Sequence, residues 1–134
     1  MADVATLPTE AEWEYAYKAN SKLLSPWGDE GDKYPEFGWS EGNSGGETHP
    51  VAQKKPNPWG LYDMGGSVWE WNLDMTREFK GKVTDPMGPT TTTGDRSIRG
   101  GSAFDHPDRE WFCRRNSIGA AHREKNIGFR AVLH

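Results

Sequence analysis

Residues 48–71 read THPVAQKKPNPWGLYDMGGSVWEW. Prolines and glycines are frequent in the first part of this stretch, and they favour turns over helices and strands. The stretch ends on Val68, Trp69, Glu70 and Trp71, which do not alternate between apolar and polar as a half-exposed strand does. We therefore predict that a turn-rich segment leads into a strand at 68–71 that is covered on both faces.

The same turn-forming composition extends upstream, over residues 25–60. A long segment rich in glycine and proline is often a disordered linker. This one also carries large rings at Trp27, Phe37, Trp39 and Trp59. Their spacing favours a loop that is held on the core by its rings, and the disordered linker is the alternative.

One segment has a strong helix pattern. Thr9 and Glu12 have the spacing of a capping box, in which each side chain bonds to the backbone of the other residue. Trp13, Ala16 and Tyr17 then lie on one apolar face of a helix. We predict a helix over residues 10–19.

The second half of the chain has shorter signals. Strands are expected at 97–99, 111–114 and 128–133, the last closing the sheet beside the chain end. Glycines predict a turn at 100–102, and a polar segment rich in Pro, Gly and Thr predicts an exposed loop at 84–95.

The composition narrows the classes of function. The chain has 134 residues, a length that suits one domain, and a net charge of −4, which argues against a nucleic-acid-binding face. A single cysteine, Cys113, excludes an intramolecular disulfide and zinc sites that need several cysteines. Because it has neither a long apolar run nor a signal-peptide pattern, we expect no membrane insertion. The cellular location stays open between the cytoplasm and a surface reached through another component.

Four sequence motifs occur here in one order: LPTEAEWEYA at 7–16, the stretch at 48–71, RGGS at 99–102 and IGFR at 127–130. Together they resemble the formylglycine-generating enzyme and sulfatase-modifying factor family. The resemblance implies an α+β, loop-rich fold of the C-type lectin type. It further implies one principal helix and a small antiparallel sheet, in a single domain that spans residues 1–134.

The resemblance also implies a longer N-terminal region than this chain has, since only residues 1–6 precede the first predicted elements. The fold is then N-terminally shortened, or a partner chain or oligomer covers that side. A missing segment would leave an exposed apolar patch on the helix face of Trp13 and Tyr17.

The catalytic members of the family resembled here use two cysteines after the GGS turn to bind copper. Thiolates suit that metal, but an ungapped alignment places Asp105 and Glu110 at the two positions. Cys113 is read as a small buried side chain. A related branch binds iron through a His-x₃-His-x-Glu motif, which this chain lacks. We therefore expect no catalysis and no redox cofactor, with a divergent oxidoreductase-like relative as the alternative.

The resemblance implies a structural calcium ion in the turn before the strand at 68–71. Its ligands would be the side chains of Asp63 and Glu70 and the carbonyl groups of Gly66 and Val68. Such hard oxygen ligands are the ones that calcium prefers. In the alternative, Asp63 caps the turn and Glu70 forms a buried pair with an arginine such as Arg99 or Arg130.

Residues 103–126 are the predicted ligand-binding surface. Rings, imidazoles and short polar groups suit an adaptable binding surface, and in the family resembled here this segment crosses the ligand face. The ligand would be a protein or a glycan, and ordinary loop variation is the alternative. The candidate residues are Phe104, Asp105, His106, Trp111, Phe112, Asn116, Ser117, Ile118, His122 and Glu124.

One branch of the resembled family comprises variable proteins of diversity-generating retroelements, whose last segment is rewritten by mutation of adenines. Six candidates can arise by changing the first two letters of an Asn codon that ends in C, whereas Trp111, Glu124 and Lys125 cannot. We expect a non-catalytic variable protein of this type. A structural subunit completed by another chain is a further alternative. The six reachable residues are Phe104, Asp105, His106, Ser117, Ile118 and His122.

Overall fold

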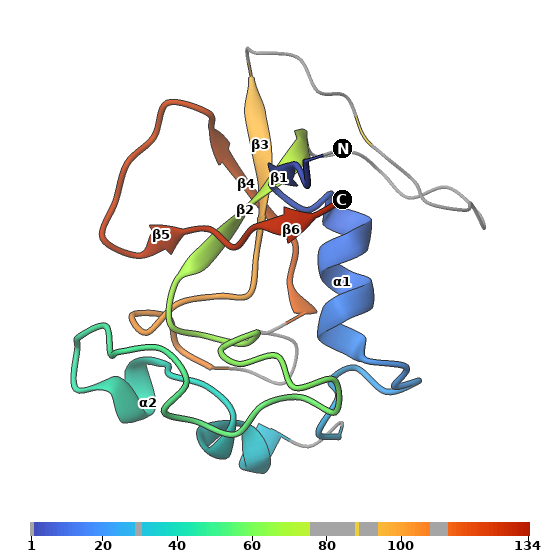
Figure 1. The fold of residues 1–134 in the computed structure, drawn as a ribbon. Coiled ribbons are helices and arrows are strands. Elements are labelled where there is room, and N and C mark those ends of the chain that lie inside the picture. The colour runs from blue at the N-terminus through green and yellow to red at the C-terminus, as the bar shows by residue number, and fades with distance from the viewer. Residues whose placement is uncertain (1, 29–30, 76–87, 89–93, 108–112) are drawn as a thin grey trace.

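The computed structural model describes the whole chain except residues 1, 29–30, 76–87, 89–93 and 108–112. It contains one nine-residue α-helix, two short helices and short strands joined by long loops (Figure 1). In chain order the described elements are β1 (Ala5–Thr6), α1 (Glu10–Lys18), the 3₁₀ helix η1 (Gly31–Glu36), α2 (Glu41–Ser44), β2 (Trp69–Met75), β3 (Asp95–Arg99), β4 (Asn116–Gly119), β5 (Ile127–Gly128) and β6 (Val132–Leu133).

The main sheet has the strand order β4-β3-β2-β5. β2 and β3, and β3 and β4, are antiparallel, but β5 runs parallel to β2. The expectation of an antiparallel sheet was therefore wrong for this one pair. β1 and β6 form a separate antiparallel pair that joins the two ends of the chain, as Figure 1 shows.

Helix α1 confirms the predicted helix to within one residue. The Thr9 hydroxyl accepts from the Glu12 amide at 3.2 Å, and the Glu12 carboxylate accepts from the Thr9 amide at 2.8 Å, so the capping box is complete. The helix ends where Ala19 adopts a left-handed conformation. Within the described part of the chain, no helix combines the length and the apolar character that crossing a membrane requires.

The core is aromatic, and it holds the long loop in place. Trp13 and Tyr17 of α1 stack at 5.2 Å, Trp27 packs edge-on against Tyr17 at 5.7 Å, and Phe37 stacks on Trp27 at 4.9 Å. The predicted loop held by its rings is thereby confirmed for these residues. Trp13 and Tyr17 are buried inside the chain, so this face of the helix is not the exposed patch that a missing segment would leave.

The remaining strand predictions were partly wrong. β2 begins one residue later than expected and continues to Met75, while β4 was not predicted. The predicted strand at 128–133 is divided between β5 and β6, because the chain leaves β2 and crosses to β1.

Two predictions fall wholly or partly on residues that are not described. In the strand predicted at 111–114, Cys113 and Arg114 are not in a strand, and residues 111–112 are not described; the Cys113 carbonyl instead accepts from the Arg99 side chain at 2.8 Å. The loop predicted at 84–95 also lies largely outside the described residues.

Candidate functional site

The structure divides the predicted binding residues among three places. Phe104, Asp105 and His106 follow the GGS turn, residues 116–118 belong to β4, and residues 122–124 lie between β4 and β5. Figure 1 places β4 at the end of the sheet away from the turn at 102–107. The predicted residues are thus not one continuous patch. Trp111 and Phe112 lie outside the described residues, as does Glu110.

Asp105 holds the turn through bonds to Ser102 and Glu41. Its Oδ2 accepts hydrogen bonds from the Ser102 amide at 2.9 Å and from the Ser102 hydroxyl at 2.7 Å, and its carbonyl accepts from the Glu41 amide at 3.0 Å. These bonds tie the turn to the start of α2. Oδ2 of Asp105 therefore stabilises the turn, and a ligand contact through this half-buried residue stays a prediction.

Asp105 and His106 are neighbours, but we expect their replacement to change the stability of the protein by very different amounts. Asp105→Ala removes the acceptor for two donors of Ser102, so we expect a loss of about 1–3 kcal/mol in the free energy of unfolding. His106→Ala removes a side chain that is 85% exposed, and we expect a change within about 0.5 kcal/mol. Denaturant unfolding of both variants measures the difference. Equal losses would contradict the roles assigned to the two side chains.

Two of the three places meet at one surface. The Lys125 ammonium lies over the Phe104 ring, 4.3 Å from its centroid. The His106 ring lies 3.5 Å from the Glu41 carboxylate, and the His122 ring contacts the Glu124 carboxylate at 2.6 Å. Lys125 and Glu41 were not among the predicted site residues, because the cation–π contact and the contact of His106 with Glu41 join distant segments. We define the loop surface as Glu41, Phe104, His106, His122, Glu124 and Lys125.

The β4 residues occupy the edge of the main sheet. Asn116, Ser117 and Ile118 pair with Ile98, Ser97 and Arg96 of β3. Asn116 is exposed, and its side-chain oxygen accepts from the Ser117 amide at 2.9 Å, while Ser117 and Ile118 are half-buried. Of these three, Asn116 is therefore the most accessible to a ligand.

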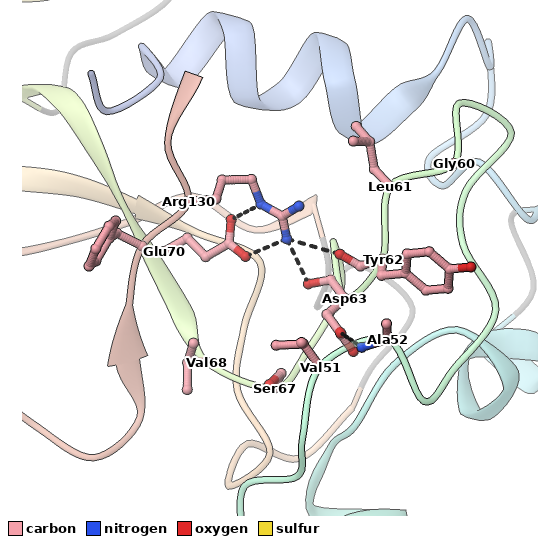
Figure 2. A pocket seen from close by; sticks show the side chains of 11 residues that line it. Val51, Ala52, Gly60, Leu61, Tyr62, Asp63, Ser67, Val68, Glu70 and Arg130 are labelled. Carbon is pink, nitrogen blue, oxygen red and sulfur yellow. Dashed lines mark hydrogen bonds and ion pairs between the residues drawn. The ribbon is translucent and has the colours of Figure 1, made fainter. Parts of the chain in front are cut away.

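A pocket of about 430 Å³ lies beside the 63–70 segment (Figure 2), and three of the predicted calcium ligands, Asp63, Val68 and Glu70, line it. The cavity itself was not predicted, because it forms where two of the sequence motifs, 48–71 and 127–130, meet in space. Its lining residues are Val51, Ala52, Gly60, Leu61, Tyr62, Asp63, Ser67, Val68, Glu70, Phe129 and Arg130.

Glu70 forms a buried pair with Arg130 in this pocket. Arg130 donates to both Glu70 oxygens, at 2.8 and 2.7 Å (Figure 2). Trp13 donates its indole N–H to Glu70 Oε2 at 2.7 Å. Arg130 also donates to the carbonyl groups of Tyr62 and Asp63. Burial alone would lower the pKa of Arg130, but the hydrogen bond and charge of Glu70, aided by the charge of Asp63, raise the pKa above its usual value. The guanidinium is thus a fixed positive charge in the pocket.

The two carboxylates among the predicted calcium ligands, Asp63 and Glu70, have different surroundings. Asp63 is 8% exposed; its Oδ2 accepts from the Ala52 amide at 2.8 Å, and its Oδ1 is buried without a hydrogen-bond partner. The Glu70 carboxylate, in contrast, is held by Arg130, and a divalent ion shared with Glu70 would lie beside that guanidinium. The arrangement therefore matches the alternative predicted for Glu70, a buried pair, with Arg130 as the partner.

Gly66 and Val68, the other two predicted ligands, lie in a turn that ties three loops together. The Gly66 amide donates to the Gly100 carbonyl at 2.7 Å, and the neighbouring Ser67 amide donates to the Trp39 carbonyl at 3.0 Å. The Ser67 carbonyl in turn accepts from the Ala103 amide at 2.8 Å. This turn therefore positions the start of the 103–126 segment.

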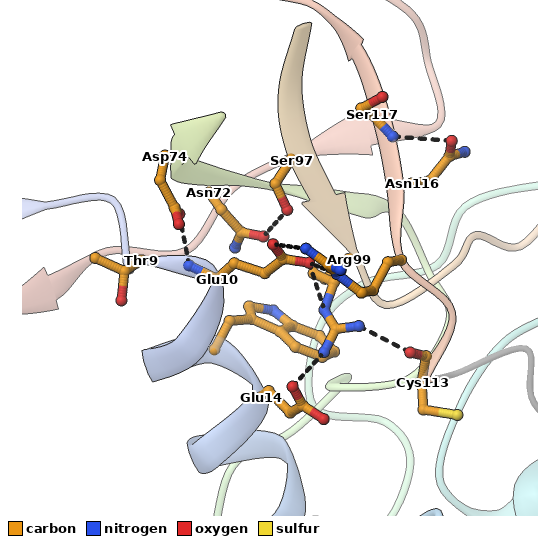
Figure 3. A network of polar contacts seen from close by, with 12 residues as sticks. Thr9, Glu10, Glu14, Asn72, Asp74, Ser97, Arg99, Cys113, Asn116 and Ser117 are labelled. Atoms are coloured by element: carbon orange, nitrogen blue, oxygen red, sulfur yellow. Dashed lines mark hydrogen bonds and ion pairs between the residues drawn. The ribbon is translucent and has the colours of Figure 1, made fainter. Parts of the chain in front are cut away.

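A buried ionic network anchors α1 to the sheet (Figure 3). Arg115 donates to both oxygens of Glu10, at 2.7 and 2.9 Å, and this bonding raises the pKa of Arg115. Arg99, which is 1% exposed, lies 3.7 Å from Glu10 and 3.1 Å from Glu14. Arg99 is therefore occupied here and not available to Glu70.

The described residues contain no cluster of three or more His, Cys, Asp or Glu side chains able to hold a metal ion. Cys113 packs against the aromatic core, but it is half-buried and not fully buried as expected.

Comparisons with known proteins agree on one family. The sequence model of the sulfatase-modifying factor enzyme 1-like domain matches residues 4–134. The formylglycine-generating enzyme of Streptomyces coelicolor is 33% identical over 94% of this chain, and the serine/threonine-protein kinase pkn1 of Chlamydia caviae is 35% identical over 90% of it. The match covers 46% of the first relative and 18% of the second, so this chain spans less than half of their lengths.

Solved structures show the same relationship. Treponema denticola variable protein 1 has a TM-score of 0.84 and 34% identity, and the match covers 95% of this chain and 46% of that one. PvdO from Pseudomonas aeruginosa has a TM-score of 0.79 and 30% identity, covering 96% and 52%. The fold and the sequence thus lead to one conclusion: the chain belongs to the formylglycine-generating enzyme and sulfatase-modifying factor family.

Proposed function

We propose that this chain is a non-catalytic ligand-binding domain, of the kind found in variable proteins of diversity-generating retroelements. The observation that carries the proposal is its likeness to Treponema denticola variable protein 1 over 95% of the chain. The ligand is a protein or a glycan, bound by the loop surface, and Asn116 on β4 is a separate candidate contact.

The loop surface has the properties that variation of a binding site requires. His106 is 85% exposed, and the side chains of His122 and Glu124 are also accessible. The turn that carries His106 is held by backbone bonds and by the bonds of Asp105 to the buried Ser102. Side chains on such a surface can change without loss of the framework bonds. The ring of Phe104 under Lys125 adds a flat apolar contact beside a positive charge, a combination suited to protein or glycan surfaces.

A displayed library tests the proposal. Positions His106, His122, Glu124 and Lys125 are randomised, and the library is selected against a panel of unrelated proteins and glycans. A matched control library randomises Ser102 and Asp105 instead. We expect binders to emerge from the first library and few folded members in the second. Failure of the first library to give any saturable binder, with its members folded, would contradict the proposal.

A divergent oxidoreductase-like enzyme is the second candidate, and the names of the formylglycine-generating enzyme relatives favour it. It would require a copper or iron centre, which His106 or Cys113 would have to help form. Metal analysis after copper or iron loading, together with an oxidation assay on a cysteine-containing peptide, separates it from the first candidate. Activity lost in His106→Ala or Cys113→Ala would favour the enzyme.

A structural subunit completed by another chain is the third candidate. Val4, just before β1, and Leu133 of β6 are 59% and 70% exposed, and an apolar partner could cover them. Light scattering of the purified chain measures its mass; a stable oligomer broken by Leu133→Lys would favour this candidate.

A further inference from the structure

The pocket in Figure 2 contains one acidic group whose charge is not balanced within it. Of its three charged side chains, Glu70 and Arg130 neutralise each other through two hydrogen bonds. Asp63 remains. Its Oδ2 has a backbone donor, but its Oδ1 is buried and has no partner. A buried carboxylate oxygen without a donor is costly, so a ligand that supplies a donor or a positive charge would be stabilised there.

The rim of the pocket is apolar and accessible. Val51 is 80% exposed, Phe129 is 72% exposed and Tyr62 is 41% exposed, and all three line the same cavity. A bare metal ion would use neither these side chains nor a volume of about 430 Å³, which is in the range of small-molecule sites. An organic cation would bury its apolar part against the rim and gain a cation–π contribution from the rings.

The charge of the ligand is limited by Arg130. This guanidinium already donates to Glu70 and to the carbonyl groups of Tyr62 and Asp63, so it is a fixed positive charge that disfavours a second cation close to Glu70. A divalent ion bridging Asp63 and Glu70 would meet it directly. A ligand with a single positive charge, paired with Asp63 alone, fits this pocket better than a divalent ion.

We propose that this pocket binds a primary ammonium group on an apolar stem, as in the side chain of lysine. The ammonium donates to Asp63 Oδ1, and the stem lies along Tyr62 and Phe129. None of the lining residues belongs to the loop surface, so the site is separate from the one in the proposed function and does not depend on it.

Titration followed by NMR shifts or calorimetry tests the proposal with four probes. Nα-acetyl-lysine amide represents a lysine side chain of a partner, and n-hexylamine represents a free amine. The same lysine amide acetylated on Nε is the uncharged control, and calcium chloride is the competing ion. We expect saturable binding of the first two probes and none of the Nε-acetylated one. The stronger of the two identifies the natural source of the ammonium.

Two variants locate the site. Asp63→Asn removes the charge but keeps an oxygen for the Ala52 amide, and asparagine tolerates the positive φ of 54° at this position; we expect binding to weaken about tenfold or more. Phe129→Ala changes an exposed ring, so the fold should persist while binding weakens about threefold. Lys22→Ala, an exposed side chain outside both the pocket and the loop surface, is the control that should leave binding unchanged.

Three results would overturn the proposal. One is equal binding of the charged and the Nε-acetylated lysine amides, and another is unchanged binding in folded Asp63→Asn. The third is tight calcium binding that Asp63→Asn abolishes and that the amines do not displace, which would assign the pocket to the metal. Because the loop surface is unaltered in these variants, none of these results bears on the proposed ligand-binding function.

Discussion

Gly66→Ala is expected to destabilise the protein by about 3 kcal/mol or more. Gly66 has a φ of +82°, and a Cβ at this position would overlap the backbone carbonyl of Trp39. Moving Trp39 away would also break the bonds from the Ser67 amide to Trp39 and from the Gly66 amide to Gly100. The substitution therefore disrupts the bonds that connect three loops, and not a single contact. Chemical denaturation measures the free energy of unfolding.

Gly60→Ala is the matched control. Gly60 has nearly the same φ, +79°, but a Cβ there would meet nothing within 4 Å. Its replacement should cost only the conformational penalty of a left-handed alanine, about 1–2 kcal/mol. If the two variants lose the same stability, the overlap with Trp39 does not determine the effect.

Glu10→Ala is expected to cost about 3–5 kcal/mol, the range for breaking a buried ion pair. Both oxygens of Glu10 accept from Arg115, and Arg99 lies beside them with 1% of its surface exposed. Removing the carboxylate leaves buried positive charge under α1 (Figure 3). Denaturant unfolding at neutral pH measures this loss.

Glu14→Ala provides the comparison on the same helix and against the same arginine. Its carboxylate lies 3.1 Å from Arg99, but its side chain is 39% exposed. Water screens such a pair, so we expect a loss of at most about 1 kcal/mol. A loss for Glu10→Ala no larger than that for Glu14→Ala would contradict the role given to burial.

Local signals in the sequence predicted local structure well. The limits of α1 follow from the capping box of Thr9 and Glu12 and from the apolar spacing of Trp13 and Tyr17, all within one short segment. The loop held by its rings was also predictable, because Trp27 and Phe37 had no other way to be buried. Where neighbouring residues decide the structure, the sequence sufficed.

Contacts between distant segments could not be predicted. β4 has no apolar alternation, and it forms a strand because β3 offers it a free edge. The parallel pairing of β5 depends on where the chain end crosses β2. The pocket likewise requires the motifs at 48–71 and 127–130 to meet, so no spacing in the sequence describes it.

The arginine that pairs with Glu70 is a second contact between distant residues that the sequence alone could not determine. Arg99 and Arg130 were both candidates from the sequence, since each belongs to a family motif. The choice follows from Glu10 and Glu14, which lie beside Arg99 and leave Arg130 for Glu70. Asp105 is a similar case, because only the geometry reveals its bonds to Ser102.

The thermal unfolding midpoints of binders selected from the library at His106, His122, Glu124 and Lys125 test the central claim most directly. If a stable framework carries a variable binding surface, binders to unrelated ligands will have midpoints within about 5 °C of the parent protein. If every binder unfolds far below the parent, those side chains belong to the framework, and the proposed separation of framework from binding surface is wrong.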